Sequence, residues 1–68
     1  MITESEADKA MVRGLVVIVN GIDGEIAGRL VERKRFKGAR LPFYRFRWRA
    51  GASWRESWAH PKDLVRID

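Results

Sequence analysis

The sequence contains no cysteine, two prolines and a single histidine in 68 residues. The lack of cysteine excludes disulfides, thiolate metal sites and cysteine nucleophiles. A small domain without disulfides is typical of a reducing compartment, so we expect a cytoplasmic location. The lone histidine, His60, has no second histidine or cysteine to complete a zinc site, so we expect no metal and no cofactor. We instead expect His60 to set up the turn at Pro61.

Long hydrophobic runs are also lacking. The longest run, Leu15 to Val19, is far shorter than a bilayer-spanning helix of about 20 residues. Residues 1–6 lack the basic start and the apolar stretch of a signal peptide. The sequence therefore predicts neither membrane insertion nor secretion.

The length limits the chain to one small domain. A chain of this size buries only about 60% of the surface that its unfolded form exposes, which leaves room for one thin core and no deep cleft. Hydrophobic residues make up 46% of the sequence and charged residues 34%, a composition typical of a folded domain. We therefore expect a globular binding module and not an enzyme.

Residues 11–68 carry the pattern of a small all-β fold. Gly28 falls inside the second predicted strand, where it marks a bulge or a sharp bend. Tyr44, Phe46 and Trp48 share one face of the third strand, opposite three arginines. Proline suits the first position of a helical turn, so we expect a 3-10 turn at residues 60–64. The predicted strands are residues 12–19, 25–36, 41–49, 53–58 and 65–67.

Residues 1–10 have no apolar periodicity, and we interpret them as a flexible acidic tail outside the core. A short capped turn beginning at Thr3 or Ser5 is the alternative. The predicted core is Leu15, Val17, Val19, Ile26, Leu30, Tyr44, Phe46, Trp48, Leu64 and Ile67. Val16 and Ile18 lie on the opposite side of the first strand, so a second subunit covering them, in a homodimer, is a hypothesis.

The closing segment, Trp58-Ala59-His60-Pro61-Lys62-Asp63-Leu64-Val65-Arg66-Ile67, resembles the SH3-like barrel family. The resemblance implies a five-stranded SH3-like barrel with a 3-10 turn before the last strand. The stretch from Pro61 to Asp68 is similar to the end of the basic SH3-like C-terminal domains of retroviral integrases, which implies DNA binding. Nothing here resembles the catalytic or zinc-binding domains of those enzymes.

Pro61, Leu64 and Arg66-Ile67 also resemble the closing segment of type II dihydrofolate reductases, which build a shared pore from four SH3-like subunits. That family has a Gln-Ile-Tyr element before the proline, where this chain has Trp58-Ala59-His60. The departure removes the substrate-contacting side chains, so a tetrameric reductase is a remote alternative.

Basic residues concentrate in residues 29–49. This segment holds nine Arg and Lys residues against one acidic residue, Glu32, a net charge of +8, whereas the rest of the chain sums to −3. A hairpin would gather these charges on one surface, where phosphates are their natural counter-charge. The residues predicted to bind are Arg33, Lys34, Arg35, Lys37 and Arg40 at the hairpin tip and Arg45, Arg47 and Arg49 along its second strand.

Three interpretations of this basic segment stay open. Seven of the nine cations are arginines, which suit bidentate phosphate contacts and stacking on bases, and this favours DNA or RNA as the partner. The same surface would suit an acidic or nucleic-acid-mimicking protein, in a protein-interaction module or small inhibitor. The charges would otherwise only keep a small barrel in solution.

Aromatic residues supply the second candidate binding feature. Phe43 shares a face with the arginines of the third strand, and we expect it to be an exposed platform for base stacking. Trp54, at the start of the fourth strand, is the next candidate. Phe46 and Trp48 are predicted to be core residues because of their alternation.

Overall fold

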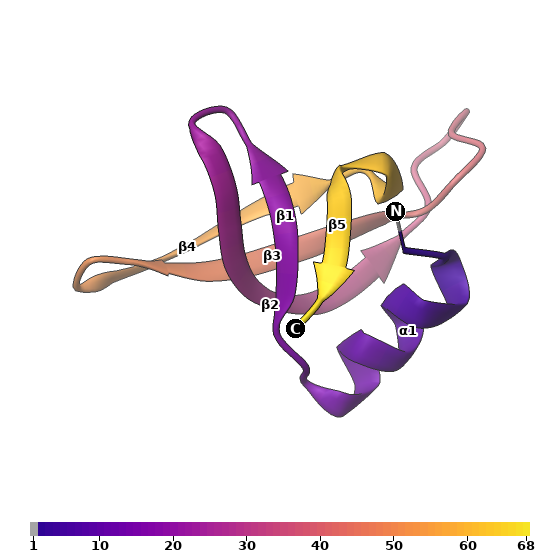
Figure 1. The fold of residues 1–68 in the computed structure, drawn as a ribbon. Helices are drawn as coiled ribbons and strands as arrows, with labels where there is room; N and C mark the ends of the chain where they lie inside the picture. The colour runs from indigo at the N-terminus through magenta and orange to yellow at the C-terminus, as the bar shows by residue number, and fades with distance from the viewer. Residues whose placement is uncertain (1) are drawn as a thin grey trace.

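A computed structural model describes residues 2–68, in which five strands form one antiparallel sheet with one α-helix beside it (Figure 1). The elements are α1 (Glu4–Arg13), β1 (Val17–Gly21), β2 (Gly24–Lys34), β3 (Phe43–Ala50), β4 (Ser53–Ala59), the 3-10 turn η1 (Pro61–Asp63) and β5 (Leu64–Ile67). The strand order across the sheet is β4-β3-β2-β1-β5. The predicted all-β fold, with a 3-10 turn before the last strand, is confirmed.

Strand β2 joins the two halves of the sheet, and Figure 1 shows it curving through the molecule. Its first part, through Gly28, pairs with β1, and its second part, from Arg29, pairs with β3. A Cβ atom at Gly28 would collide with the carbonyl oxygen of Arg47 and would lie 2.7 Å from Cζ of Phe46. The glycine is therefore required because β3 and the Phe46 ring approach the backbone of β2 at its change of partner.

The bulge in β2 lies at Val31, three residues after Gly28. Leu30 pairs with Phe46 and Glu32 with Arg45, so Val31 is an extra residue without a partner on β3. One inserted residue reverses the alternation of side chains beyond it. Arg33, which pairs with Tyr44, therefore points to the inner face instead of the outer one.

The third strand has the predicted two faces. Tyr44 is 0% exposed and Phe46 3%, while Trp48 is half-buried and stacks on Phe46 with ring centroids 5.5 Å apart. The arginines of β3 face outward, alternating with these aromatic residues. Strand β4 pairs with β3 along its whole length, and the hairpin that they form extends beyond the rest of the sheet in Figure 1.

The N-terminal segment is a helix and not a flexible tail. The Thr3 hydroxyl accepts a hydrogen bond from the Glu6 N–H (3.1 Å), and the Glu6 carboxylate accepts one from the Thr3 N–H (2.9 Å). These two bonds form a capping box, which begins the helix at the position predicted for a capped turn. Ala7 and Ala10 are 0% exposed, so a stripe of small residues docks α1 against the sheet. The tail prediction was wrong because alanines give a weak periodic signal.

The end of α1 shortens the first strand. Gly14 adopts a left-handed conformation (φ 67°, ψ 32°) that ends the helix. Residues 12–14 therefore belong to the helix and its cap, and the strand begins at Val17 instead of at residue 12. Leu15 lies in the connection and is 37% exposed, so its predicted place in the core was wrong.

Most of the other predicted core residues are confirmed. Val17, Val19, Leu30, Tyr44, Phe46 and Leu64 are buried, and Ile26, Trp48 and Ile67 pack against them. Ile2, Ala7, Ala10 and Ala59 also belong to this cluster, although they were not predicted. Ile18 is only 6% exposed within the single chain, so burial of Ile18 does not require a second subunit.

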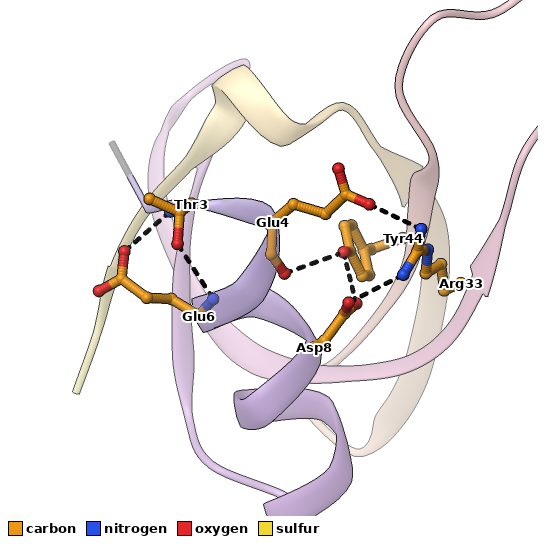
Figure 2. A network of polar contacts seen from close by, with 6 residues as sticks. All are labelled: Thr3, Glu4, Glu6, Asp8, Arg33 and Tyr44. Atoms are coloured by element: carbon orange, nitrogen blue, oxygen red, sulfur yellow. Dashed lines mark hydrogen bonds and ion pairs between the residues drawn. The ribbon is translucent and has the colours of Figure 1, made fainter.

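A polar network fastens α1 to the inner face of the sheet (Figure 2). The Arg33 guanidinium forms ion pairs with Glu4 Oε1 (2.6 Å) and Asp8 Oδ2 (2.8 Å). The Tyr44 hydroxyl donates a hydrogen bond to Asp8 Oδ1 (2.7 Å). Burial and this hydrogen bond raise the pKa of the Tyr44 hydroxyl above its ordinary value, so the group stays protonated as the donor.

Candidate functional site

The outer face of strands β2, β3 and β4 carries the basic residues predicted on the third strand. Cross-strand partners share a face, so the register fixes what each arginine meets. Arg45 lies between Glu32 and Trp58, and Arg49 lies opposite Trp54. Three of the predicted residues, Arg45, Arg47 and Arg49, are thereby brought onto one surface.

Two carboxylates, Glu32 and Glu56, lie in the middle of this surface and separate its two ends. The Nε atom of Arg45 lies 3.5 Å from both Glu32 Oε1 and Glu56 Oε1. Glu56 Oε2 also lies 3.8 Å from Nε of Arg47. Glu32 and Glu56 together balance the charges of Arg45 and Arg47, so the middle of the face, where Arg45 is predicted to contact a ligand, is close to neutral.

One end of the face, toward the tip of the β3–β4 hairpin, is a hollow of about 380 Å³. Val16, Ala27 and Val31 contribute apolar surface to it, and the Trp54 side chain, which is 52% exposed, forms part of its wall. We refer to this feature as the Trp54 hollow. Its charged lining residues are Arg29, Arg47 and Arg49.

The guanidinium groups of the Trp54 hollow are held in place by the backbone and by the indole. Arg29 Nε donates a hydrogen bond to the Gly14 carbonyl oxygen (2.9 Å), and Arg49 Nε donates one to the Gly51 carbonyl oxygen (3.1 Å). The guanidinium carbons of Arg47 and Arg49 lie 4.9 and 5.6 Å from the centroid of the Trp54 ring. Within residues 2–68, neither Arg29 nor Arg49 has a carboxylate partner within 4.0 Å, so both charges are available to an anion.

Arg29 was not among the residues that the sequence predicted to bind. Its place in the hollow depends on its pairing with Arg47 across β2 and β3, and local spacing does not reveal such a pairing. Val16 also lines the hollow. Its apolar character on the outer side of the first strand, which suggested a dimer contact, therefore has an explanation within one chain.

The other end of the face is an aromatic cluster. The Phe43 ring meets Phe36 edge-on at 5.5 Å and His60 at 5.2 Å, while Phe36 meets Trp58 at 5.1 Å. Phe43 is half-buried in this cluster, so it is less open than the exposed platform that we expected. The ammonium group of Lys34 lies 5.2 Å from the centre of the Phe36 ring.

The connection between β2 and β3 carries the predicted cations of the hairpin tip. Arg35, Lys37 and Arg40 are exposed, and none of them has an ion-pair partner in the part of the chain that the structure describes. Arg33 does not join them. Its guanidinium forms two ion pairs with α1 on the inner side of the sheet, away from these exposed cations.

The single histidine acts in the turn before the last strand, as expected. His60 Nδ1 accepts a hydrogen bond from the Lys62 N–H (3.1 Å) and so caps η1. Among residues 2–68, no three His, Cys, Asp or Glu side chains gather where they could hold a metal ion. No helix in the same residues has the length and apolar character needed to cross a membrane.

Comparisons with protein-family models, with curated proteins and with solved structures find no match to this chain.

Proposed function

We propose that this chain is a non-catalytic nucleic-acid-binding module of the SH3-like barrel type, which contacts the phosphate backbone with the outer face of β2, β3 and β4. The observation that carries the proposal is the Trp54 hollow. Arg29, Arg47 and Arg49 line it around an exposed indole, and two of these three guanidiniums have no carboxylate partner in the described chain. Arginine beside an exposed aromatic ring is the combination that binds phosphate and stacks on bases.

The connection between β2 and β3 supports the same function. Arg35, Lys37 and Arg40 in this connection, and Lys34 at the end of β2, are exposed and add four positive charges at the margin of the face that carries Arg47 and Arg49. Clustered cations repel one another in the free protein, and a polyanion relieves this repulsion by releasing its condensed counterions. The proposal therefore predicts affinity that falls steeply with salt.

The test is a fluorescence-anisotropy titration against mixed-sequence DNA and RNA at about 50 and 200 mM salt. We expect Arg47→Gln/Arg49→Gln to lower the affinity at least about ten-fold and to reduce the salt slope by about one to two units. Lys9→Gln/Lys62→Gln is the matched control, because both of these lysines are exposed and belong to α1 and η1, outside the three strands of the candidate face. Equal losses in the two double variants would show that only net charge matters and would refute the site.

A second candidate function, docking to an acidic partner protein, is favoured by strand β4. Six of its seven residues are exposed, and of the described strands only β3 pairs with it, so a partner's strand could add to its free edge. If the chain binds neither DNA nor RNA at the lower salt concentration, docking to an acidic protein becomes the favoured function. Capture of an acidic protein by the native chain and not by the Arg47→Gln/Arg49→Gln variant would support it.

A further inference from the structure

The shape and lining of the Trp54 hollow distinguish between two forms of nucleic acid. Its volume of about 380 Å³ lies near the lower end of the range of small-molecule sites, about 300–1,000 Å³. A space of this size accommodates one nucleotide and not a double helix. A duplex would contact only the guanidinium groups at the rim of the hollow, because the bases of a duplex are paired and stacked and do not project from it.

The apolar lining fits a planar base. Val16, Ala27 and Val31 offer surface without hydrogen-bonding side chains, and the half-exposed Trp54 indole offers a ring for stacking. Phosphate contacts alone do not require such a surface. Stacking on an aromatic side chain suits any base, since every base has a π-face, and therefore gives affinity without sequence preference.

The arginines are placed for the phosphate next to such a base. The Nε atoms of Arg29 and Arg49 are already engaged by backbone carbonyls, which orients the two groups and leaves their terminal N–H groups to an anion. The Arg47 guanidinium lies 4.9 Å from the centre of the Trp54 ring, so a base stacked on the indole and its own phosphate fall within reach of the same cluster.

We infer that the Trp54 hollow binds one unpaired nucleotide, its base against Trp54 and its phosphate between Arg29 and Arg49, and that the chain prefers single-stranded nucleic acid to duplex. The inference rests on the proposed nucleic-acid-binding function and specifies its substrate class. DNA and RNA strands offer the same base and phosphate, and the test uses both.

The experiment compares a fluorescein-labelled mixed-sequence strand of about ten nucleotides, as DNA and as RNA, with the duplex of the same DNA sequence at one salt concentration. We expect the native chain to bind at least one of the single strands about ten-fold more tightly than the duplex. Trp54→Ala is expected to weaken single-strand binding about ten-fold and to change duplex binding less than about two-fold. Trp54→Phe, which keeps an aromatic ring, is expected to retain most of the preference.

Trp58→Ala is the matched control, because Trp58 is an exposed tryptophan of the same strand whose ring contacts Phe36 in the aromatic cluster, outside the hollow. Trp58→Phe replaces it if the alanine variant does not fold, as judged by thermal unfolding. Loss of single-strand affinity in Trp54→Ala but not at Trp58 supports the inference. Equal affinity of the native chain for strand and duplex, or equal losses at Trp54 and Trp58, overturns the inference and leaves the proposed function standing. Absence of binding to all of the nucleic acids overturns both.

Discussion

At the scale of single residues, Tyr44 connects the core to the surface network. Its ring is fully buried, while its hydroxyl reaches Asp8 on α1. The chain has one tyrosine, so the ionisation of this group is directly observable by ultraviolet absorbance. Its environment favours the neutral hydroxyl, because ionisation would place a charge in the protein interior beside the Asp8 carboxylate.

We expect the pKa of Tyr44 in the folded protein to exceed the ordinary tyrosine value of about 10 and to return to that value in denaturant. Because folding raises this pKa, its contribution to the free energy of unfolding is complete below about pH 10 and is lost as the pH rises above it. Absorbance titration at the tyrosinate band, with and without urea, measures both values. Identical titration curves for the folded and the unfolded protein would contradict the burial of this hydroxyl. The Tyr44→Phe variant, which has no tyrosine, gives the background absorbance.

Gly28 is the second residue whose role depends on contacts distant in sequence. Gly28→Ala places a methyl group against the Arg47 carbonyl oxygen and the Phe46 ring, so we expect a loss of about 1–3 kcal/mol in the free energy of unfolding. Urea denaturation followed by tryptophan fluorescence gives the value. Ala27→Ser at the exposed neighbouring position is the control and is expected to change stability by less than about 0.5 kcal/mol. A similarly small change in Gly28→Ala would contradict the close approach of the Arg47 carbonyl oxygen and the Phe46 ring to the backbone at Gly28.

At the scale of elements, the bulge at Val31 decides which arginines remain available to a ligand. It places Arg33 on the inner face, where Glu4 and Asp8 hold it, whereas Arg29, which precedes the bulge, stays on the outer face. Helix α1 thus uses one cation of the basic segment for its own attachment. Its C-terminal cap also supplies the Gly14 carbonyl that holds Arg29, so the helix supports the Trp54 hollow from outside it.

Arg33 and Arg49 therefore provide a matched pair of single substitutions. Arg33→Gln removes both ion pairs to α1, and we expect it to reduce the free energy of unfolding by about 1 kcal/mol while leaving nucleic-acid affinity within about two-fold. Arg49→Gln also removes one positive charge. We expect it to lower the nucleic-acid affinity by more than about two-fold and to change the free energy of unfolding by less than about 0.5 kcal/mol. Denaturation and anisotropy titrations on both variants test this. Parallel effects at the two positions would mean that the two arginines are not divided between attachment and binding.

At the scale of the whole molecule, the chain is a compact domain with one small hydrophobic core. Its radius of gyration is 11.2 Å, close to the value of about 11 Å expected for a compact chain of this length. The outer side of β1 needs no second subunit, since Ile18 is buried within one chain and Val16 lines the Trp54 hollow.

We therefore expect the protein to be a monomer, with a mass of 7.9 kDa by light scattering after size-exclusion chromatography. The measurement is made at moderate salt and without nucleic acid, so that a bridging polyanion does not contribute. A dimer would restore the hypothesis of contact through the first strand. A tetramer would restore the remote alternative of a pore enzyme, and an assay of NADPH-dependent dihydrofolate reduction would then follow.

Local sequence patterns predicted much of the sheet. The alternation in residues 43–50 sets the two faces of β3, because a strand places successive side chains on opposite sides whatever its neighbours are. The proline after His60 similarly specifies the 3-10 turn. These signals are determined by backbone geometry over a few residues, so the sequence by itself was sufficient for them.

Only the tertiary structure decided which of the basic residues lie together on one face and which are held in ion pairs. The bulge at Val31 arises from pairing with β3, and it moved Arg33 away from the surface where local alternation would place it. The carboxylates that neutralise Arg45, and the register that brings Arg29 to the Trp54 hollow, come from other strands. The sequence determined the number of charges, but long-range pairing determined which of them are in ion pairs and which line the Trp54 hollow, because an ion pair or a hollow depends on distances between segments far apart along the chain.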